Sequence, residues 1–422
     1  MTTEDASQPD ASDQAAPGSQ AAPQQGAIVF LLATAFINSM GMGLTTPVMP
    51  ALLEELSGGD ISDAAFWGGV ALVSYALMQF VFSPIVGALS DRYGRRPILL
   101  FSLIAFAADM LLLAVVNALW MFIVVRAVAG IFASTFSTTA AYVADVTPPD
   151  KRAQRFAMIG AAFGAGFIFG PAIGGALGDI DTRLPFFAGA AVAGANAVFG
   201  AFVVRESLPE SMRRPFSWAR ATTVGTIMSL TRMPGVARLL PVFFLATLST
   251  WVYPTVWSYV ATAKFAWTEG QIGWSIAYYG MIAFIAQALV LQVVLPRISL
   301  ALAVWASLLV EALALTGIGL ATVGWVVYAM ITTSLFSAMQ DPAIRQQLSA
   351  RVPADAQGEL QGGLSALTSI AMILAPLLYN GLFTLSSGAD PVLSLPGSPF
   401  LVAAVFSLVA IAFYVRAMHR KD

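Results

Sequence analysis

The sequence predicts an all-α integral membrane protein whose twelve transmembrane helices form two six-helix bundles. Hydrophobic residues make up 58% of the 422 residues and charged residues only 10%, against about 45–50% and about 25% in soluble domains. A soluble particle of this size could not cover its surface with so few charges. Stretches of about 20 apolar residues, the length that spans hydrocarbon as a helix, recur at 27–49, 65–88, 98–116, 120–143, 156–177, 185–204, 239–261, 272–294, 298–320, 323–347, 360–383 and 399–417.

The basic residues predict the orientation of these helices. With the N-terminus in the cytoplasm, the inner loops hold eighteen of the 21 lysines and arginines, whereas the outer loops hold only Arg183 and Lys264. Basic residues accumulate on the cytoplasmic side of membrane proteins, so we expect both termini there. Residues 1–26 contain no lysine or arginine and are rich in polar residues and proline, which predicts a disordered cytoplasmic tail. Residues 418–422 form a short cytoplasmic C-terminus.

The longest internal loop, residues 205–238, contains six arginines and divides the chain. It separates a predicted six-helix bundle at 27–204 from a second one at 239–417. Pro171 and Pro376 occupy similar positions in the two halves, which indicates a duplication. Proteins built from two such halves bind substrate near the midplane of the membrane, between the halves.

Three ionisable side chains are predicted to lie well inside the bilayer: Asp109, Arg126 and Glu311. Each costs at least ~2.5–3.5 kcal/mol on insertion scales, so a functional role is the default interpretation. Burial favours the neutral form of a carboxyl group, which allows it to carry a proton reversibly. A structural ion pair between Asp109 and Arg126 is the alternative, whereas the second half has no intramembrane base to pair with Glu311.

Two short motifs stand at particular helices. Residues 87–97 read GALSDRYGRRP, in which Gly87 would permit close helix approach, Gly94 a tight turn, and Asp91 hydrogen bonds from an arginine. Arg92, Arg95 and Arg96 would anchor this loop in the cytoplasm. Residues 170–175 read GPAIGG, with Gly170, Pro171, Gly174 and Gly175; helix packing alone is the alternative explanation for these glycines.

The first motif resembles the G-x-x-x-D-R-x-G-R-R signature of the major facilitator superfamily, and GPAIGG looks like its antiporter motif. Segments such as SDRYGRRPILL, NALWMFIVVRAVAGI and GPAIGGALGD are similar to the twelve-helix tetracycline/proton antiporters. The resemblance implies proton-coupled efflux of tetracycline-like or other amphiphilic drugs by alternating access, in the bacterial inner membrane. Asp109, Glu311 and Arg126 would then serve proton coupling. An importer or facilitator of a small metabolite is the alternative function.

The resemblance and the aromatic residues of the seventh and eighth helices suggest where substrate binds. The expected substrate residues are Asn38, Tyr75, Gln79, Arg126, Trp257, Tyr278 and Gln287. The aromatic residues could instead be anchors at the membrane interface. Two positions depart from the family pattern: Asn38 replaces an aspartate of the first helix, and Ala283 replaces a histidine of the eighth.

The remaining expectations concern partners. The partners are a small-molecule drug, protons and lipid, without nucleic acid, and the protein is a monomer. No resident cofactor or metal is expected, although the drug can arrive as a divalent-metal chelate. An ATP-driven pump needs a G-x-x-x-x-G-K-[ST] loop, and no Gly-Lys pair occurs in the sequence. The chain is therefore expected to be a transporter and not an enzyme.

Overall fold

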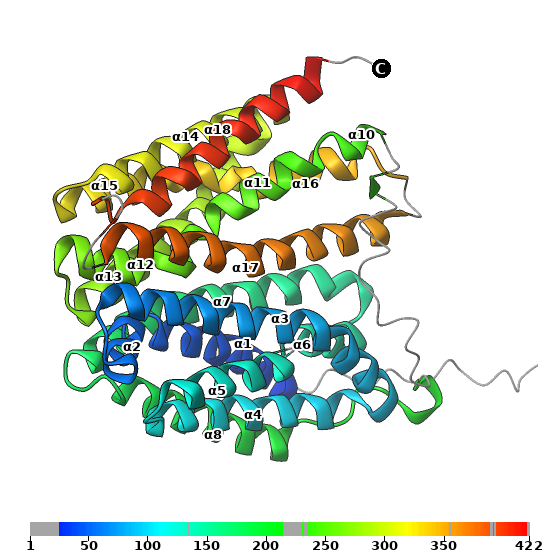
Figure 1. Cartoon of the computed structure of the whole chain (residues 1–422). Helices are drawn as coiled ribbons and strands as arrows, with labels where there is room; N and C mark the ends of the chain where they lie inside the picture. Colours follow the sequence, from blue (N-terminus) through cyan, green and yellow to red (C-terminus); the bar gives the residue numbers. More distant parts are fainter. Residues whose placement is uncertain are drawn as a thin grey trace, which may run out of the picture.

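The computed structural model describes residues 25–133, 135–213, 230–231, 234–353, 356–388, 391 and 394–419. Most of the predicted N-terminal tail, most of the 205–238 loop and the last three residues therefore lie outside the described residues. Figure 1 shows two groups of helices stacked on each other. The first group consists of α1 (Gln25–Thr45), α2 (Met49–Ser57), α3 (Ile61–Tyr93), α4 (Arg95–Val115), α5 (Leu119–Phe132), α6 (Thr135–Val146), α7 (Pro149–Gly178) and α8 (Leu184–Val203).

The second group begins with a short helix, α10 (Pro234–Ala237). It continues with α11 (Leu240–Thr250), α12 (Val252–Phe265), α13 (Glu269–Ile285), η3 (Ala286–Val294), η4 (Leu295–Arg297), α14 (Leu300–Leu320), α15 (Gly324–Thr333), η5 (Ser334–Met339), α16 (Gln340–Ser349), α17 (Gln357–Ser387) and α18 (Ser398–His419). In the described part of the chain, ten helical stretches are long and apolar enough to cross a membrane, and α5 is a shorter apolar helix. The twelve predicted spans are all present, the fourth, seventh and tenth as interrupted helices.

The interruptions correct the expectation of continuous helices at 120–143, 239–261 and 323–347. In the tenth span, the Thr333 and Ser334 hydroxyls donate to carbonyls three residues earlier, at 2.7 Å each, a local bond that competes with the α-helical pattern. The 3₁₀-helix η5 begins at Ser334. In the seventh span the break at Trp251 precedes Pro254, whose ring has no N–H for a continuous helix. The eighth span ends in a π-helix, η3.

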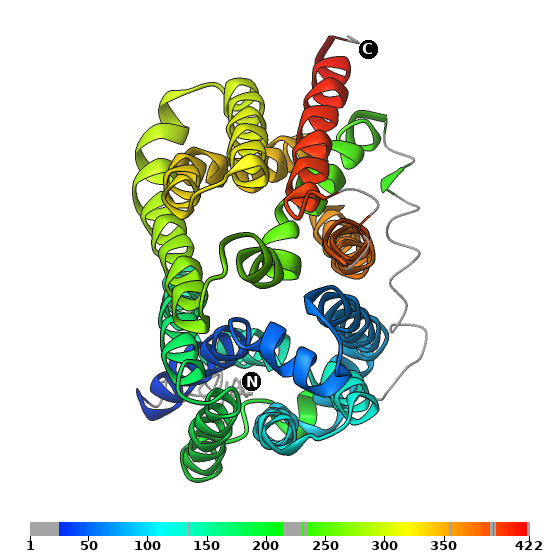
Figure 2. The same ribbon diagram turned by 60° about the vertical axis from the view of Figure 1, so that its left-hand side comes forward.

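The two ends of the bundle differ, and we name them by their residues. The α2 end contains α2 and the connections 58–60, 179–183 and 266–268. The opposite end, which we call the linker end, contains Gly94 and residues 204–213, where the long 205–238 loop between the two groups begins. Within the first group α1 packs on α7, and α4 on α8; within the second group α18 packs on α14 and α11. Contacts between the groups run along α7 with α13 and α3 with α17 (Figure 2).

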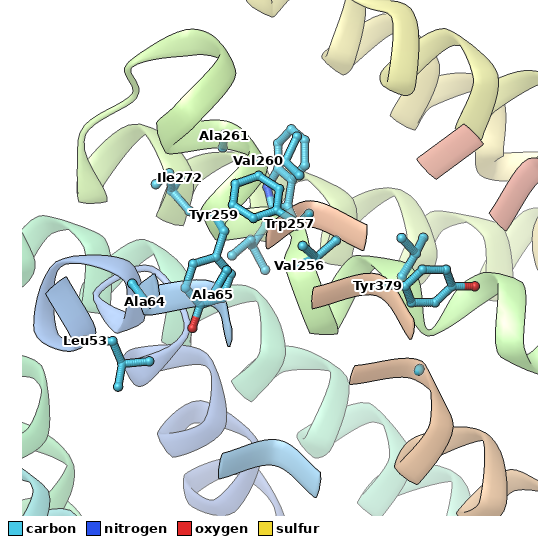
Figure 3. Close-up of a cluster of buried hydrophobic side chains, with 14 of the residues drawn as sticks. Leu53, Ala64, Ala65, Val256, Trp257, Tyr259, Val260, Ala261, Ile272 and Tyr379 are labelled. Atoms are coloured by element: carbon cyan, nitrogen blue, oxygen red, sulfur yellow. The ribbon is translucent and has the colours of Figure 1, made fainter. Parts of the chain in front are cut away.

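At the α2 end the two groups of helices are bonded to each other. The Asn380 side-chain amide donates to the Ala65 carbonyl at 2.8 Å, and the Ser258 hydroxyl to the Thr46 carbonyl at 2.9 Å. The backbone N–H of Gly270 donates to the Asp179 carboxylate at 2.8 Å. Around these bonds lies a buried apolar cluster with residues from both groups, among them Leu53, Ala64, Val256, Tyr259 and Val260 (Figure 3). The α2 end is therefore closed.

The groups diverge toward the linker end. A Cβ added at Gly69, Gly175 or Gly273 would meet atoms of the opposite group, whereas one added at Gly87 or Gly164 would meet nothing within 4 Å. The expectation that Gly87 supports close helix approach is therefore wrong in this conformation, because its surroundings are open.

We predict that Asn380→Ala weakens the closed α2 end. It removes a buried hydrogen bond worth about 1 kcal/mol, so the open population should rise about five-fold. The reporter is a cysteine at Ala64, which is fully buried in the apolar cluster of this end: its maleimide labelling should accelerate by that factor. Asn196→Ala is the matched control, because the Asn196 amide donates to Thr34 within one group of helices. Equal labelling in both variants would contradict the closed-end interpretation.

Candidate functional site: buried charges between the helices

Asp109 and Arg126 form an ion pair inside the first group of helices. Asp109 lies on α4 with a side chain 6% exposed, and Arg126 lies on α5 with one 17% exposed. Tyr75 of α3 completes the arrangement, since the Arg126 guanidinium lies 5.8 Å from the centre of its ring, within cation–π range. One Asp109 oxygen and the Arg126 Nε are buried without a hydrogen-bond partner. The pair expected as the structural alternative is thus present, although its hydrogen bonding is incomplete.

Glu311 has a different environment in the second group. Its side chain is 3% exposed on α14, and within the described residues no lysine or arginine pairs with it. Ser337, in the 3₁₀-helix η5, lies beside its carboxyl group, but the Ser337 hydroxyl donates to the Ser334 carbonyl at 2.7 Å. One carboxyl oxygen of Glu311 has no partner. The hydroxyl of the nearby Tyr253 is buried and also unpartnered. This pocket therefore holds a carboxyl group without an opposite charge.

The structure places four of the predicted substrate residues on three helices, and buries a fifth, Trp257, in the core. Tyr75 and Gln79 share a face of α3, Asn38 is half-buried on α1, and Gln287 is exposed on the π-helix η3. Trp257 lies in the core in this conformation: it is 5% exposed, and its indole N–H donates to Ser275 at 2.9 Å. It therefore does not lie at the membrane interface.

Tyr278 was also expected to contact substrate, and the structure places it elsewhere. Its hydroxyl shares a hydrogen bond of 2.7 Å with Thr332, and its ring packs on Tyr328. Both partners lie on α15, in the same group of helices. The adjacent Tyr279 instead stacks on Tyr253, with ring centres 4.9 Å apart, near Glu311. Tyr253 and Tyr279 are therefore the aromatic residues that lie beside Glu311.

The motif at residues 87–97 forms the turn between α3 and α4. Gly94 has a φ of 103°, which favours glycine, and separates the two helices. Arg95 binds Asp91 at 2.6 Å and Asp145 of α6 at 3.2 Å. Asp91 thus accepts from an arginine, as expected. Arg92 packs over the ring of the adjacent Tyr93.

A residue missed in the sequence holds this turn in place. The Glu206 carboxylate, just after α8, accepts hydrogen bonds from the backbone N–H groups of Arg95 and Arg96 at 2.7 and 3.3 Å. A carboxylate at a helix N-terminus is favourable because four N–H groups there lack helical partners. The Arg96 side chain donates to the Ala201 carbonyl at 2.8 Å. The only sequence signal was an acid directly after a predicted helix.

The GPAIGG motif lies where α7 is packed between α1 and α13. A Cβ at Gly170 or Gly174 would collide with the backbone of α1, and one at Gly175 with the backbone of Glu269 in the second group. Pro171 lies against Gly43 of α1. The glycines of this motif therefore allow close helix packing, and Gly175 makes one of the contacts between the two groups at the closed end.

Carboxylates of both groups gather at the α2 end. Glu54 on α2 is half-buried, and burial, together with the charges of Asp60 and of Glu269 from the second group, raises the pKa of Glu54 above its ordinary value. Closing this end brings the carboxylate of Glu269, from the second group, close to that of Glu54, from the first. Their repulsion is absent while Glu54 is protonated and fully present above its raised pKa, so acidification at this end favours closure. Clusters of three or more His, Asp or Glu side chains placed to hold a metal do not occur among the described residues.

Comparison with known proteins identifies the family. The model of the Major Facilitator Superfamily matches residues 31–258. The class C tetracycline resistance protein of Escherichia coli is 35% identical over 396 residues, covering 91% of this chain and 95% of the relative. The chain belongs to the major facilitator superfamily and, within it, to the family of the tetracycline resistance proteins. It is thus a membrane transporter.

Other relatives agree with this membership. The class D tetracycline resistance protein of Salmonella ordonez is 36% identical, covering 84% of this chain and 89% of the relative. Among solved structures, a bacterial homolog of the human lysosomal transporter Spinster has a TM-score of 0.75 at 15% identity, covering 95% of this chain and 98% of that one. The latter similarity supports the fold alone.

We predict that the buried ion pair of this transporter is strongly coupled in stability. Arg126→Gln leaves Asp109 as an uncompensated buried charge, which costs about 3–5 kcal/mol; adding Asp109→Asn removes that charge. The double variant should therefore unfold at a higher temperature than Arg126→Gln, as measured by thermal unfolding in detergent. Arg345→Gln is the control, since its pair with Asp341 is exposed and worth about 0–1 kcal/mol. Additive losses in the double variant would contradict the coupling.

Proposed function

We propose that the protein exports tetracycline-like and other amphiphilic drugs from the cytoplasm in exchange for protons. The observation that carries this proposal is the unpaired carboxyl group of Glu311, buried in a transporter of the tetracycline resistance family. A carboxyl group without a cation can be buried at tolerable cost only in its protonated form. Glu311 is then the proton carrier, and loss of its proton creates a buried charge that drives rearrangement.

Asp109 and Arg126 play a complementary part in this mechanism. Their ion pair neutralises both charges while the site is empty. A cationic drug or a cationic metal chelate can compete for Asp109, and Arg126 then turns toward Tyr75 or an anionic group of the substrate. The incomplete hydrogen bonding of Asp109 and Arg126 supports such an exchange, since an unsatisfied buried group binds a new partner at little loss.

The transport cycle requires two states of the bundle. Residues 27–204 and 239–417 would move as units, opening the linker end and the α2 end in alternation around the buried site. We place the linker end in the cytoplasm of a bacterium, with both termini there and the α2 end outside. The excess of arginine around the predicted inner loops supports this orientation. The closed α2 end then corresponds to the state that receives drug from the cytoplasm.

The absence of two ionisable side chains from the expected substrate site determines which substrates it favours. Asn38 and Ala283 remove an acid and an imidazole present at these positions in the family pattern. A tetracycline–metal chelate gains from acidic contacts, so tetracycline is a weaker substrate here than for transporters that keep the acid. Tyr75, Gln79, Gln287 and the Tyr253–Tyr279 pair offer aromatic faces and amides, which suit amphiphilic drugs.

We predict that Glu311→Gln and Asp109→Asn each abolish drug-driven proton movement. Glutamine at position 311 keeps the shape of the site but cannot bind and release a proton, and asparagine at position 109 has no charge for a cationic drug to bind in competition with Arg126. The measurement is the pH change inside proteoliposomes after addition of tetracycline, with thermal unfolding as the check on folding. Asp341→Asn is the control, because this acid is exposed and paired with Arg345, and it should exchange normally.

Two results would count against the proposal. Proton exchange that persists in both buried variants would place coupling elsewhere in the chain. Tetracycline movement in the wild type without any proton flux would make the protein a facilitator.

A further inference from the structure

The molecule contains a groove between its two groups of helices that is distinct from the buried ion pair. It has a volume of about 270 Å³ and is formed by α3 and α17 alone. Pro84 lies within α3 at the groove. The groove occupies the part of both helices that runs from the middle of the membrane toward the linker end. There the two groups diverge, whereas Asn380 joins the same two helices at the α2 end.

The groove faces two environments at once. On the wheel of α3, its residues 76, 79, 80, 83 and 84 lie between the side that carries Tyr75 and the side that carries Leu77 and Val81. Tyr75 contacts Arg126, whereas Leu77 and Val81 are 45% and 48% exposed, as apolar side chains facing lipid are. The groove-lining side of α3 therefore lies between the side that faces the buried ion pair and the side that carries exposed apolar residues.

The lining of the groove is amphiphilic. Gln79 and Ser83 of α3 face Ser365 and Ser369 of α17, and Phe80 and Met372 supply apolar surface. The Ser369 hydroxyl donates to the Ser365 carbonyl at 3.1 Å, so its oxygen can still accept. A lipid acyl chain has no group that could form a hydrogen bond with this amide and these three hydroxyls. Pockets for drug-sized ligands, in contrast, combine apolar walls with a few polar groups. Met372 is flexible and adapts to different shapes.

We propose that this groove is the entry site for substrate, where an amphiphilic drug dissolved in the leaflet at the linker end binds before it reaches Tyr75 and Arg126. The inference rests on the proposed drug export. The volume of the groove is slightly below the range of about 300–1,000 Å³ for complete ligand pockets. The groove therefore holds part of the drug, while the rest stays among the lipid chains. Gln79 belongs to both sites and transfers the drug from one to the other.

The test uses the cysteine-free chain in full length. Ser369→Cys is reacted with N-ethylmaleimide in detergent, with and without saturating tetracycline, and Leu374→Cys is the matched control because Leu374 is 41% exposed on another face of α17. Tetracycline should slow the reaction at position 369 at least five-fold and leave that at 374 unchanged, roughly as expected for a site occupied most of the time. An unchanged rate at 369 overturns the proposal. Slowing by added phospholipid but not by tetracycline assigns the groove to acyl chains and also overturns it.

A transport measurement tests the route separately. Ser369→Trp fills the groove and should raise the KM for tetracycline in proteoliposomes at least about five-fold, with little change in kcat. This pattern indicates weaker substrate binding at an unchanged turnover rate. Leu374→Trp should behave as wild type. A wild-type KM in the Ser369→Trp variant overturns the entry route. If the wild type moves no tetracycline, the proposed function fails, and the labelling result still decides whether the groove binds the drug.

Discussion

The cost of placing charge in hydrocarbon constrains this protein more than any other interaction. Three ionisable groups lie deep in the helices, and the two halves accommodate them differently. In the first half, Asp109 and Arg126 neutralise each other beside Tyr75. In the second half, Glu311 has a serine hydroxyl and two tyrosines around it but no cation. One half thus holds a charge pair that a substrate can divide, and the other holds a group that must carry a proton to remain buried.

The packing between the halves closes the α2 end in this conformation, while the halves diverge toward the linker end. Glycines allow α7 to touch both α1 and α13 near the α2 end, and Asn380 and Ser258 add hydrogen bonds there. Toward the linker end α3 and α17 separate, and the α3–α17 groove lies in the gap. Hydrogen bonds of about 1 kcal/mol each and a buried apolar cluster with residues of both halves hold the closed end together. The repulsion between Glu54 and Glu269 acts on the same end.

Much of the architecture followed from composition and from rare residues. Length and apolarity predicted the twelve spans, and the scarcity of charge made Asp109, Arg126 and Glu311 conspicuous. Gly94 and Asp91 behaved as their chemistry requires. The interruptions at Trp251 and Ser334 were missed because hydropathy averages over a whole span and does not register competing side-chain hydrogen bonds. The core position of Trp257 was not predicted for a related reason: in a membrane protein both the lipid-facing and the core-facing sides of a helix are apolar, so periodicity does not separate them. Glu206 and the serines of α17 act on residues far away in the sequence, which a single chain cannot reveal.

The central claim is that Glu311 carries the proton that is exchanged for drug. Infrared difference spectroscopy tests it directly, since a protonated carboxyl group has a carbonyl band that a carboxylate lacks. In liposomes at neutral pH, the drug-free wild type should show such a band, tetracycline should remove it, and Glu311→Gln should lack it from the start. A band that persists in Glu311→Gln, or a wild type whose carboxyl groups are all ionised before drug is added, would contradict the account.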